Sequence, residues 1–192
     1  MLTGDKVETA TCIAISCRLK TPKQREYYIK ENASISYVEE RLSYFKNKQN
    51  NDEVLIIDGI CLEVALQNLE KLFFEAAMRS PSVVCCRCSP TQKAIIVRTI
   101  KKYTTKRTLA IGDGGNDVAM IQESHLGVGI KGKEGMQASL AADYSLSKFK
   151  HLKLLLLWFG RISYKNTALI SHFVIHRGLI ISFIQVIFLI DI

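Results

Sequence analysis

Short apolar runs typical of β-strands alternate with helix-like stretches over residues 1–150. The runs are 54–58, 83–86 and 108–112, and the stretches that follow them are 62–78, 92–103 and 117–123. Such alternation predicts an α/β fold with a parallel sheet. Two more short apolar runs, 127–130 and 143–146, flank a predicted short helix at 134–140 and add strands to the sheet.

Residues 20–53 differ from this pattern because they are polar, rich in Lys, Asn, Gln, Glu and Ser, and without a sustained apolar period. We interpret the segment as a surface insertion. It contains the sequon Asn32-Ala33-Ser34, which we expect to be unused because nothing in the chain indicates secretion.

The C-terminal end is more apolar than the rest. Residues 178–190 contain no charged side chain, and extension back to Ala168 gives a stretch long enough to cross a bilayer, which needs roughly 20 residues. We predict a membrane helix at 168–192, with the buried helix of a soluble core as the alternative. The preceding residues, 148–167, predict a helix whose cations suit a cytosolic membrane face: Lys148, Lys150, His151, Lys153, Arg161 and Lys165.

Composition narrows the class of protein. The 192 residues are 48% apolar, which excludes a disordered chain, and 26 basic against 18 acidic residues give a charge of +8. The basic residues gather in the 20–53 segment and beside the membrane helix without aromatic platforms, so we expect no nucleic-acid partner. The six cysteines are few for this length, and we expect reduced thiols.

The segment Leu109-Ala110-Ile111-Gly112-Asp113-Gly114-Gly115-Asn116-Asp117 places two carboxylates in a glycine-rich turn between a strand and a helix. Ligands of α/β proteins collect at the carboxyl ends of the strands, and paired carboxylates there suit Mg²⁺. Asp113 is the first candidate metal ligand, with Asp117 beside it. Asn116 also stands where a helix N-cap belongs, so capping is its alternative role.

Two further segments could contact a phosphate. Thr3-Gly4-Asp5 precedes a helix-like run at 7–17, and it is also a good structural cap. Cys85-Cys86-Arg87-Cys88-Ser89-Pro90-Thr91-Gln92-Lys93 leaves a strand and places Lys93 in the first turn of a helix. No second Cys or His pair follows at zinc spacing, so zinc is not expected at the three cysteines.

Together and in this order, Thr3-Gly4-Asp5, Arg87 with Lys93, and Gly112 to Asp117 resemble the phosphorylation domain of P-type ATPases, relatives of the haloacid-dehalogenase phosphotransferases. Several further segments look like the phospholipid-flippase branch: residues 85–93, Gly132 to Ala138, and Ala141 to Ser145. His176 to Ser182 is most similar to the endosomal and Golgi subgroup that works without the usual accessory subunit.

The resemblance implies that an aspartate accepts the γ-phosphoryl of ATP and that its hydrolysis moves an aminophospholipid-type lipid toward the cytosolic leaflet. It also implies a role for each motif residue. Asp113 holds Mg²⁺, with Asp117 completing or orienting the metal site, and Lys93 contacts the phosphoryl group. Thr3 and Gly4 hydrogen-bond the phosphoryl group, while Asp5, Arg87 and Asn116 arrange the nucleotide. Arg177 is a candidate for the transport path, with snorkelling or structural pairing as its alternative.

One departure from the family is decisive for this chain by itself. The phosphorylated aspartate of the family lies in an Asp-Lys-Thr-Gly motif, and residues 1–192 contain no such motif. We therefore expect a fragment of a larger flippase, inactive alone, whose phosphorylation domain lacks the first strand of its sheet and exposes apolar surface. The alternatives are a P-type cation pump and an inactive, membrane-anchored binding or regulatory fragment.

The resemblance gives the predicted organisation. It has a partial, Rossmann-like haloacid-dehalogenase-type domain at 1–147 with the insertion 20–53, a stalk helix at 148–167 and a truncated membrane helix at 168–192. The expected partners are a phospholipid, the membrane and the rest of the flippase. The expected location is an endosomal, Golgi or other internal membrane, with the phosphorylation domain in the cytosol.

Overall fold

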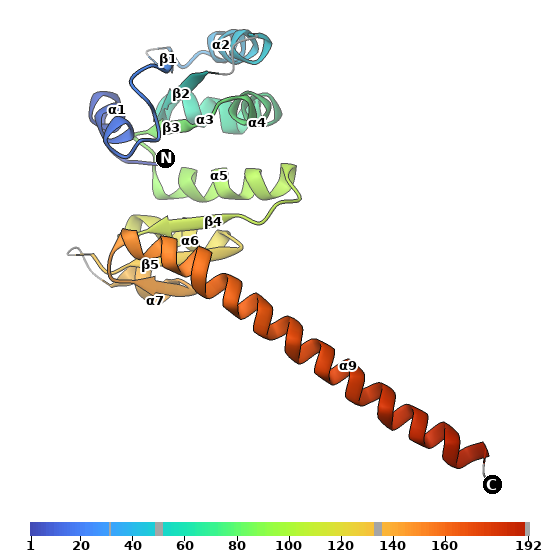
Figure 1. Cartoon of the computed structure of the whole chain (residues 1–192). Coiled ribbons are helices and arrows are strands. Elements are labelled where there is room, and N and C mark those ends of the chain that lie inside the picture. Colours follow the sequence, from blue (N-terminus) through green and yellow to red (C-terminus); the bar gives the residue numbers. More distant parts are fainter. Residues whose placement is uncertain (31, 49–51, 133–135, 191–192) are drawn as a thin grey trace. The chain divides into compact units, whose positions relative to one another are not determined.

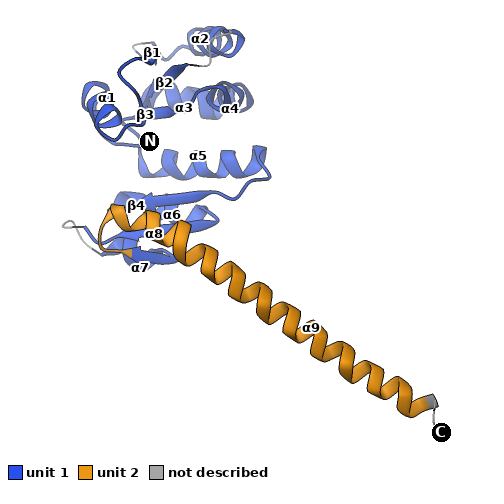
Figure 2. Ribbon diagram, viewed as in Figure 1, with its two compact units in different colours: residues 1–145 blue, residues 146–192 orange. Residues whose placement is uncertain are grey.

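The computed structural model describes residues 1–30, 32–48, 52–132 and 136–190. The chain forms two compact units, residues 1–145 and residues 146–192 (Figure 2). Part of the predicted helix at 134–140 lies outside the described residues, as do Lys133, Glu134 and Gly135 of the flippase-like segment and the last two residues of the predicted membrane helix.

The first unit has helices and strands in alternating order (Figure 1). In chain order they are α1 (Val7–Ser16), β1 (Arg25–Ile29), α2 (Ile35–Asn47), β2 (Glu53–Asp58), α3 (Gly59–Asn68), α4 (Glu70–Arg79), β3 (Val83–Cys86), α5 (Pro90–Tyr103), β4 (Leu109–Gly112), the 3-10 turn η1 (Gly115–Asp117), α6 (Val118–Glu123), β5 (Leu126–Ile130), α7 (Gln137–Ala141) and β6 (Tyr144–Leu146). The pairs β1/β2, β2/β3 and β4/β5 are parallel. The predicted α/β fold is confirmed.

Strand β2 is the centre of the core because all six of its residues are buried. Leu55 and Ile57 belong to a cluster with α2, α3 and α4, whereas Val54 and Ile56 belong to a second cluster with α1. Helices thus cover both faces of the sheet, which explains why this strand is a continuous apolar run rather than an alternating one.

The interpretation of residues 20–53 as a surface insertion is wrong. Strand β1 pairs in parallel with β2 along its whole length, and helix α2 buries Val38, Leu42 and Phe45 in the main core. These three residues follow at spacings of four and three, which is a helical period. Only three apolar residues in a thirteen-residue helix carry this period, so the polar composition hid it.

The predicted single helix at 62–78 is in fact two helices, α3 and α4, that meet at Leu69. The backbone of Leu69, at φ −130° and ψ 30°, leaves the helical region.

The strands form two separate sheets, β1-β2-β3 and β4-β5-β6. Leu2 adds a parallel bridge to Cys85 at the outer side of β3. Between Leu2 and the edge strand β4 lies a cavity of about 480 Å³ with mainly apolar lining, including Phe74, Leu109 and Ile111.

Helix α5 connects the two halves of the first unit. It contacts α3 and α4 on one side and α6 and η1 on the other. Ile96 packs into the main core, and Val97 packs with Ala110 of β4 and Met120 of α6.

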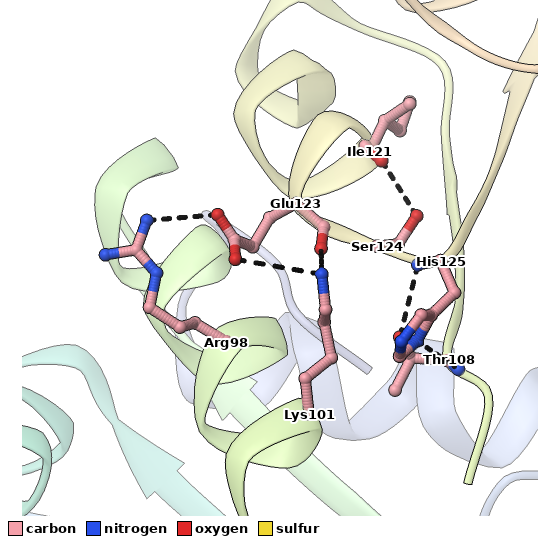
Figure 3. A network of polar contacts seen from close by, with 7 residues as sticks. All are labelled: Arg98, Lys101, Thr108, Ile121, Glu123, Ser124 and His125. Atoms are coloured by element: carbon pink, nitrogen blue, oxygen red, sulfur yellow. Dashed lines mark hydrogen bonds and ion pairs between the residues drawn. The ribbon is translucent and has the colours of Figure 1, made fainter.

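Polar contacts hold α5 against the end of α6 (Figure 3). Arg98 donates to the Glu123 carboxylate at 3.0 Å, and the Lys101 ammonium donates to the Glu123 carbonyl at 2.6 Å. The hydrogen bond from Arg98 is the main cause that lowers the pKa of the Glu123 carboxyl below its ordinary 4.5. The helix that carries Lys93 is therefore fixed to the helix that follows Asp117.

The second unit is helical. The 3-10 turn η2 (Phe149–His151) leads through α8 (Leu152–Leu154) and a π-helical turn η3 (Leu155–Phe159) into α9 (Gly160–Ile190). The helical stretch Phe149–Leu189 has 41 residues and a mean hydropathy of 1.7 in its most apolar window, so by length and composition it could cross a membrane. The helix continues through residues 167 and 168, where we predicted stalk and membrane helix to meet.

Candidate functional site

The glycine-rich turn after β4 brings Asp113 and Asp117 together. The Asp113 backbone N–H donates to Asp117 Oδ2 at 3.3 Å. A Cβ atom on Gly112 would lie 2.3 Å from the Asp117 Cβ, so only glycine lets the strand end approach this side chain. The Asp113 side chain is exposed and has no hydrogen bond or ion pair within the described residues.

Lys93 completes this group from the first turn of α5. Its ammonium contacts Asp117 Oδ1 at 2.8 Å, and the two side chains are only 9% and 14% exposed. A lysine this buried needs a partner, since an unpaired buried charge is strongly unfavourable. Asp117 thus fixes the lysine and orients the turn, while the Asp113 carboxylate stays available.

The start of α5 is held in place by a capping box. Ser89 Oγ accepts from the Gln92 backbone N–H at 3.2 Å, and Gln92 Oε1 accepts from the Ser89 backbone N–H at 2.9 Å. The Gln92 amide also donates to the Gly59 carbonyl at 3.1 Å. Gln92 therefore ties the turn that carries Lys93 to the carboxyl end of β2, a role that the sequence analysis missed although Ser89-x-x-Gln92 is a visible capping-box pattern.

Thr3, Gly4 and Asp5 form a second group beside the β3–α5 turn. Thr3 Oγ1 donates to Asp5 Oδ2 at 2.7 Å and accepts from the Asp5 backbone N–H at 3.2 Å. The Thr3 carbonyl accepts from Cys88 N–H at 2.9 Å, and the Asp5 carbonyl accepts from Arg87 N–H at 3.0 Å. Gly4 is exposed, and a Cβ there would touch nothing within 4 Å.

Arg87 belongs to this second group and not to the Asp113 turn. Its backbone has φ 51°, a left-handed conformation that is uncommon for a non-glycine residue. Its guanidinium lies 3.6 Å from the buried carboxylate of Asp58. Asp58 was not among the candidates predicted from the sequence, although Val54 to Gly59 repeats the strand, acid and glycine pattern of the Asp113 turn.

Asn116 lies exposed inside η1 and caps neither η1 nor α6, whose N-caps are Gly114 and Asp117. The capping alternative for Asn116 is wrong, because the 3-10 turn moves the helix start by one residue. Arg177 is in α9, in the second unit, and is exposed.

The thiols next to the site are fixed by burial. Cys85 and Cys86 point into different core clusters on opposite faces of the sheet. Burial raises the pKa of the Cys86 thiol to about 11, whereas a hydrogen bond from Cys85 lowers the pKa of Cys88. Within the described residues, no group of three or more Cys, His, Asp or Glu side chains could hold a metal.

The Asp113 turn fits Mg²⁺. This ion commonly uses one or two protein carboxylates and keeps several waters. One free, exposed carboxylate beside a second one that is already engaged by Lys93 matches that requirement. The structure therefore brings Lys93, Asp113 and Asp117 into one site and Thr3, Asp5 and Arg87 into a neighbouring one.

Parallel strands with acidic turns at their carboxyl ends are typical of Rossmann-like α/β domains. The family model for "haloacid dehalogenase-like hydrolase" matches residues 20–143, and the chain belongs to this family. The match includes the residues that we had interpreted as an insertion.

Within that class, the sequence is that of the type IV P-type ATPases, the phospholipid-transporting branch. The family model for "Phospholipid-translocating P-type ATPase C-terminal" matches residues 139–191. The chain is 53% identical over 188 residues to "Probable phospholipid-transporting ATPase IIB" of Danio rerio and 49% identical to "Phospholipid-transporting ATPase NEO1" of Saccharomyces cerevisiae. It is 47% identical to "Probable phospholipid-transporting ATPase tat-5" of Caenorhabditis elegans.

Each of these comparisons covers 98% of this chain but only 16–17% of the relative. The chain thus spans about a sixth of the length of the curated relatives it matches.

Proposed function

We propose that this chain supplies the lysine and the metal-binding turn of the phosphorylation domain in an ATP-driven phospholipid flippase. The observation that carries the proposal is the buried Lys93–Asp117 ion pair, with Asp113 free beside it. The names of the relatives, all phospholipid-transporting ATPases, support a lipid cargo over the cation-pump alternative.

In the proposed reaction, Mg²⁺ supplies charge neutralisation at the transferring phosphoryl group. Asp113 would hold this ion. Lys93 adds a positive charge from a buried position that Asp117 fixes, so its ammonium needs no reorganisation when the phosphoryl group arrives. Thr3, once its hydroxyl has turned from Asp5, and Gly4 would hydrogen-bond the phosphoryl oxygens, and Asp5, Arg87 and Asn116 would arrange the nucleotide.

The phosphoryl-accepting aspartate must come from residues outside this sequence, because 1–192 contain no Asp-Lys-Thr-Gly motif. The apolar cavity between Leu2 and β4 supports this proposal, since it separates two sheets at the place where another strand would join them. The chain by itself would then be inactive, and the complete protein would carry the activity.

We further propose that the complete protein resides in an endosomal, Golgi or other internal membrane, with the phosphorylation domain in the cytosol and without an obligatory accessory subunit. The likeness of residues 176–182 to that subgroup and the similarity to the NEO1 and tat-5 proteins support this. The lipid would be of the aminophospholipid type and would move toward the cytosolic leaflet.

The test is Asp113→Asn in the complete protein. The neutral amide holds Mg²⁺ poorly, so phosphoenzyme formation from radiolabelled ATP should be abolished while the protein amount is unchanged. Asp52→Asn, on a segment away from the site, is the matched control and should keep normal phosphoenzyme. A normal phosphoenzyme level in Asp113→Asn would refute the assignment.

A further inference from the structure

Trp158, Arg161 and Lys165 lie about one helical turn apart at the start of the long C-terminal helix. Trp158 belongs to the π-helical turn, and the other two residues belong to α9. Their spacings of three and four residues place successive side chains on one face. All three are exposed, Trp158 by 61%.

The two cations have no compensating acidic side chain among the described residues of their own unit. Residues 144–190 contain no Asp or Glu, and Arg161 and Lys165 have no ion pair within the part of the chain that the structure describes. Three more lysines, at 148, 150 and 153, add to the positive charge of this segment. A face with this charge attracts anions and is not neutralised by its own unit.

The sequence after Lys165 indicates the depth of this face in a membrane. Residues 166–190 include one charged side chain, Arg177, and their length of roughly 37 Å at 1.5 Å per residue suffices for a hydrocarbon core. Trp158 and Tyr164 are of the types that gather at the membrane–water interface. Arg161 and Lys165 would therefore lie at the level of the lipid headgroups.

We propose that Trp158, Arg161 and Lys165 form a site for the phosphate headgroup of an anionic phospholipid, separate from the transported lipid. The Arg161 guanidinium would bind two phosphate oxygens, the Lys165 ammonium would bind from the next turn, and the indole, on the cytosolic side of both cations, would pack against the headgroup. Arg177 lies twelve residues further along the helix, so the proposed site is distinct from the transport-path candidate. The proposal depends on membrane insertion of α9 and not on the ATPase activity.

The test uses the single tryptophan of the chain. The whole chain is placed in nanodiscs of phosphatidylcholine that contain a small fraction of spin-labelled phosphatidylserine or spin-labelled phosphatidylcholine, and the quenching of Trp158 fluorescence is measured. We expect labelled phosphatidylserine to reach half-maximal quenching at a fraction about fivefold lower than labelled phosphatidylcholine. This is the effect of about 1 kcal/mol, the contribution of one interfacial cation. Equal quenching by the two lipids overturns the proposal.

Charge-matched variants distinguish a specific headgroup site from non-specific attraction of anionic lipids to the basic segment. Arg161→Gln with Lys165→Gln should remove the preference, whereas Lys148→Gln with Lys150→Gln loses the same charge and should keep it. Equal loss in both double variants would show diffuse electrostatics and overturn the site. Circular dichroism checks that each variant keeps its helix.

Free inorganic phosphate has the same chemistry as the lipid headgroup. Competition between phosphate and the labelled lipid distinguishes the two ligands. Millimolar inorganic phosphate at constant ionic strength should leave the lipid preference unchanged. If phosphate abolishes the preference, the face binds free anions and the lipid assignment is wrong.

Discussion

Lys93 is the residue that fixes Asp117, and through it the turn that carries Asp113. Its ion pair with Asp117 is nearly buried, and Asp117 also accepts the Asp113 backbone N–H. Such a pair has little net effect on stability when it is intact, but its loss leaves one charge without a partner. The arrangement favours a fixed geometry over added stability.

We expect Lys93→Met to destabilise the first unit by about 3 kcal/mol, because it leaves the Asp117 carboxylate buried without its partner. The double variant Lys93→Met with Asp117→Leu should recover most of this loss. Urea unfolding of the whole chain in detergent, followed by circular dichroism, measures both.

The matched control is Lys102→Met, which breaks the exposed ion pair of Lys102 with Glu70 at 2.9 Å. Its effect should stay within about 1 kcal/mol. Similar losses for Lys93→Met and Lys102→Met would mean that the Lys93 pair is solvated and does not organise the site.

Strand β1 is the outer strand of the first sheet, and helix α2 packs on the main core of that sheet. Leu42 of α2 is fully buried, whereas Ile35 of the same helix is 50% exposed. Substitutions at Leu42 and Ile35 therefore test whether α2 is part of the core or a surface appendage.

Leu42→Ala should destabilise the first unit by about 2–5 kcal/mol through lost burial and a cavity, whereas Ile35→Ala should cost less than about 0.5 kcal/mol. The change in urea midpoint of each variant measures this. If both variants lose equally little free energy of unfolding, residues 20–53 are a dispensable surface insertion after all.

For the complete molecule, the proposals concern lipid transport and the place of Arg177 in the transport path. In the complete protein, Arg177→Ala should lower the rate of labelled-lipid transport several-fold if Arg177 belongs to the proposed path, because a cation inside a membrane is costly and is usually functional. Nucleotide binding should be unchanged, since Arg177 belongs to the other unit.

The control for this experiment is Lys148→Ala, at the start of the same unit, which should leave transport near normal. Transport in reconstituted vesicles and nucleotide binding by the same preparations are the two measurements. If Arg177→Ala transports lipid at the normal rate, Arg177 has a structural role only.

Helices, strands and candidate chemistry that depend only on neighbouring residues could be predicted from the sequence. The strand runs at 54–58 and 83–86, the glycine-rich turn with Asp113 and Asp117, and the apolar C-terminal helix all follow from short-range pattern, because each needs only its own residues to be recognised. The family likewise followed from motifs that are contiguous in sequence.

Features that depend on contacts between residues far apart in the chain are visible only in the tertiary structure. The polar segment 20–53 became a buried strand and helix because β2 offered a partner edge and a core, and composition carries no trace of that partner. The engagement of Asp117 by Lys93, the burial of Asp58 beside Arg87 and the tie from Gln92 to Gly59 join residues 24–33 positions apart. These contacts exist only once the helices pack on the sheets, and they, rather than the motifs, determine which carboxylate stays free.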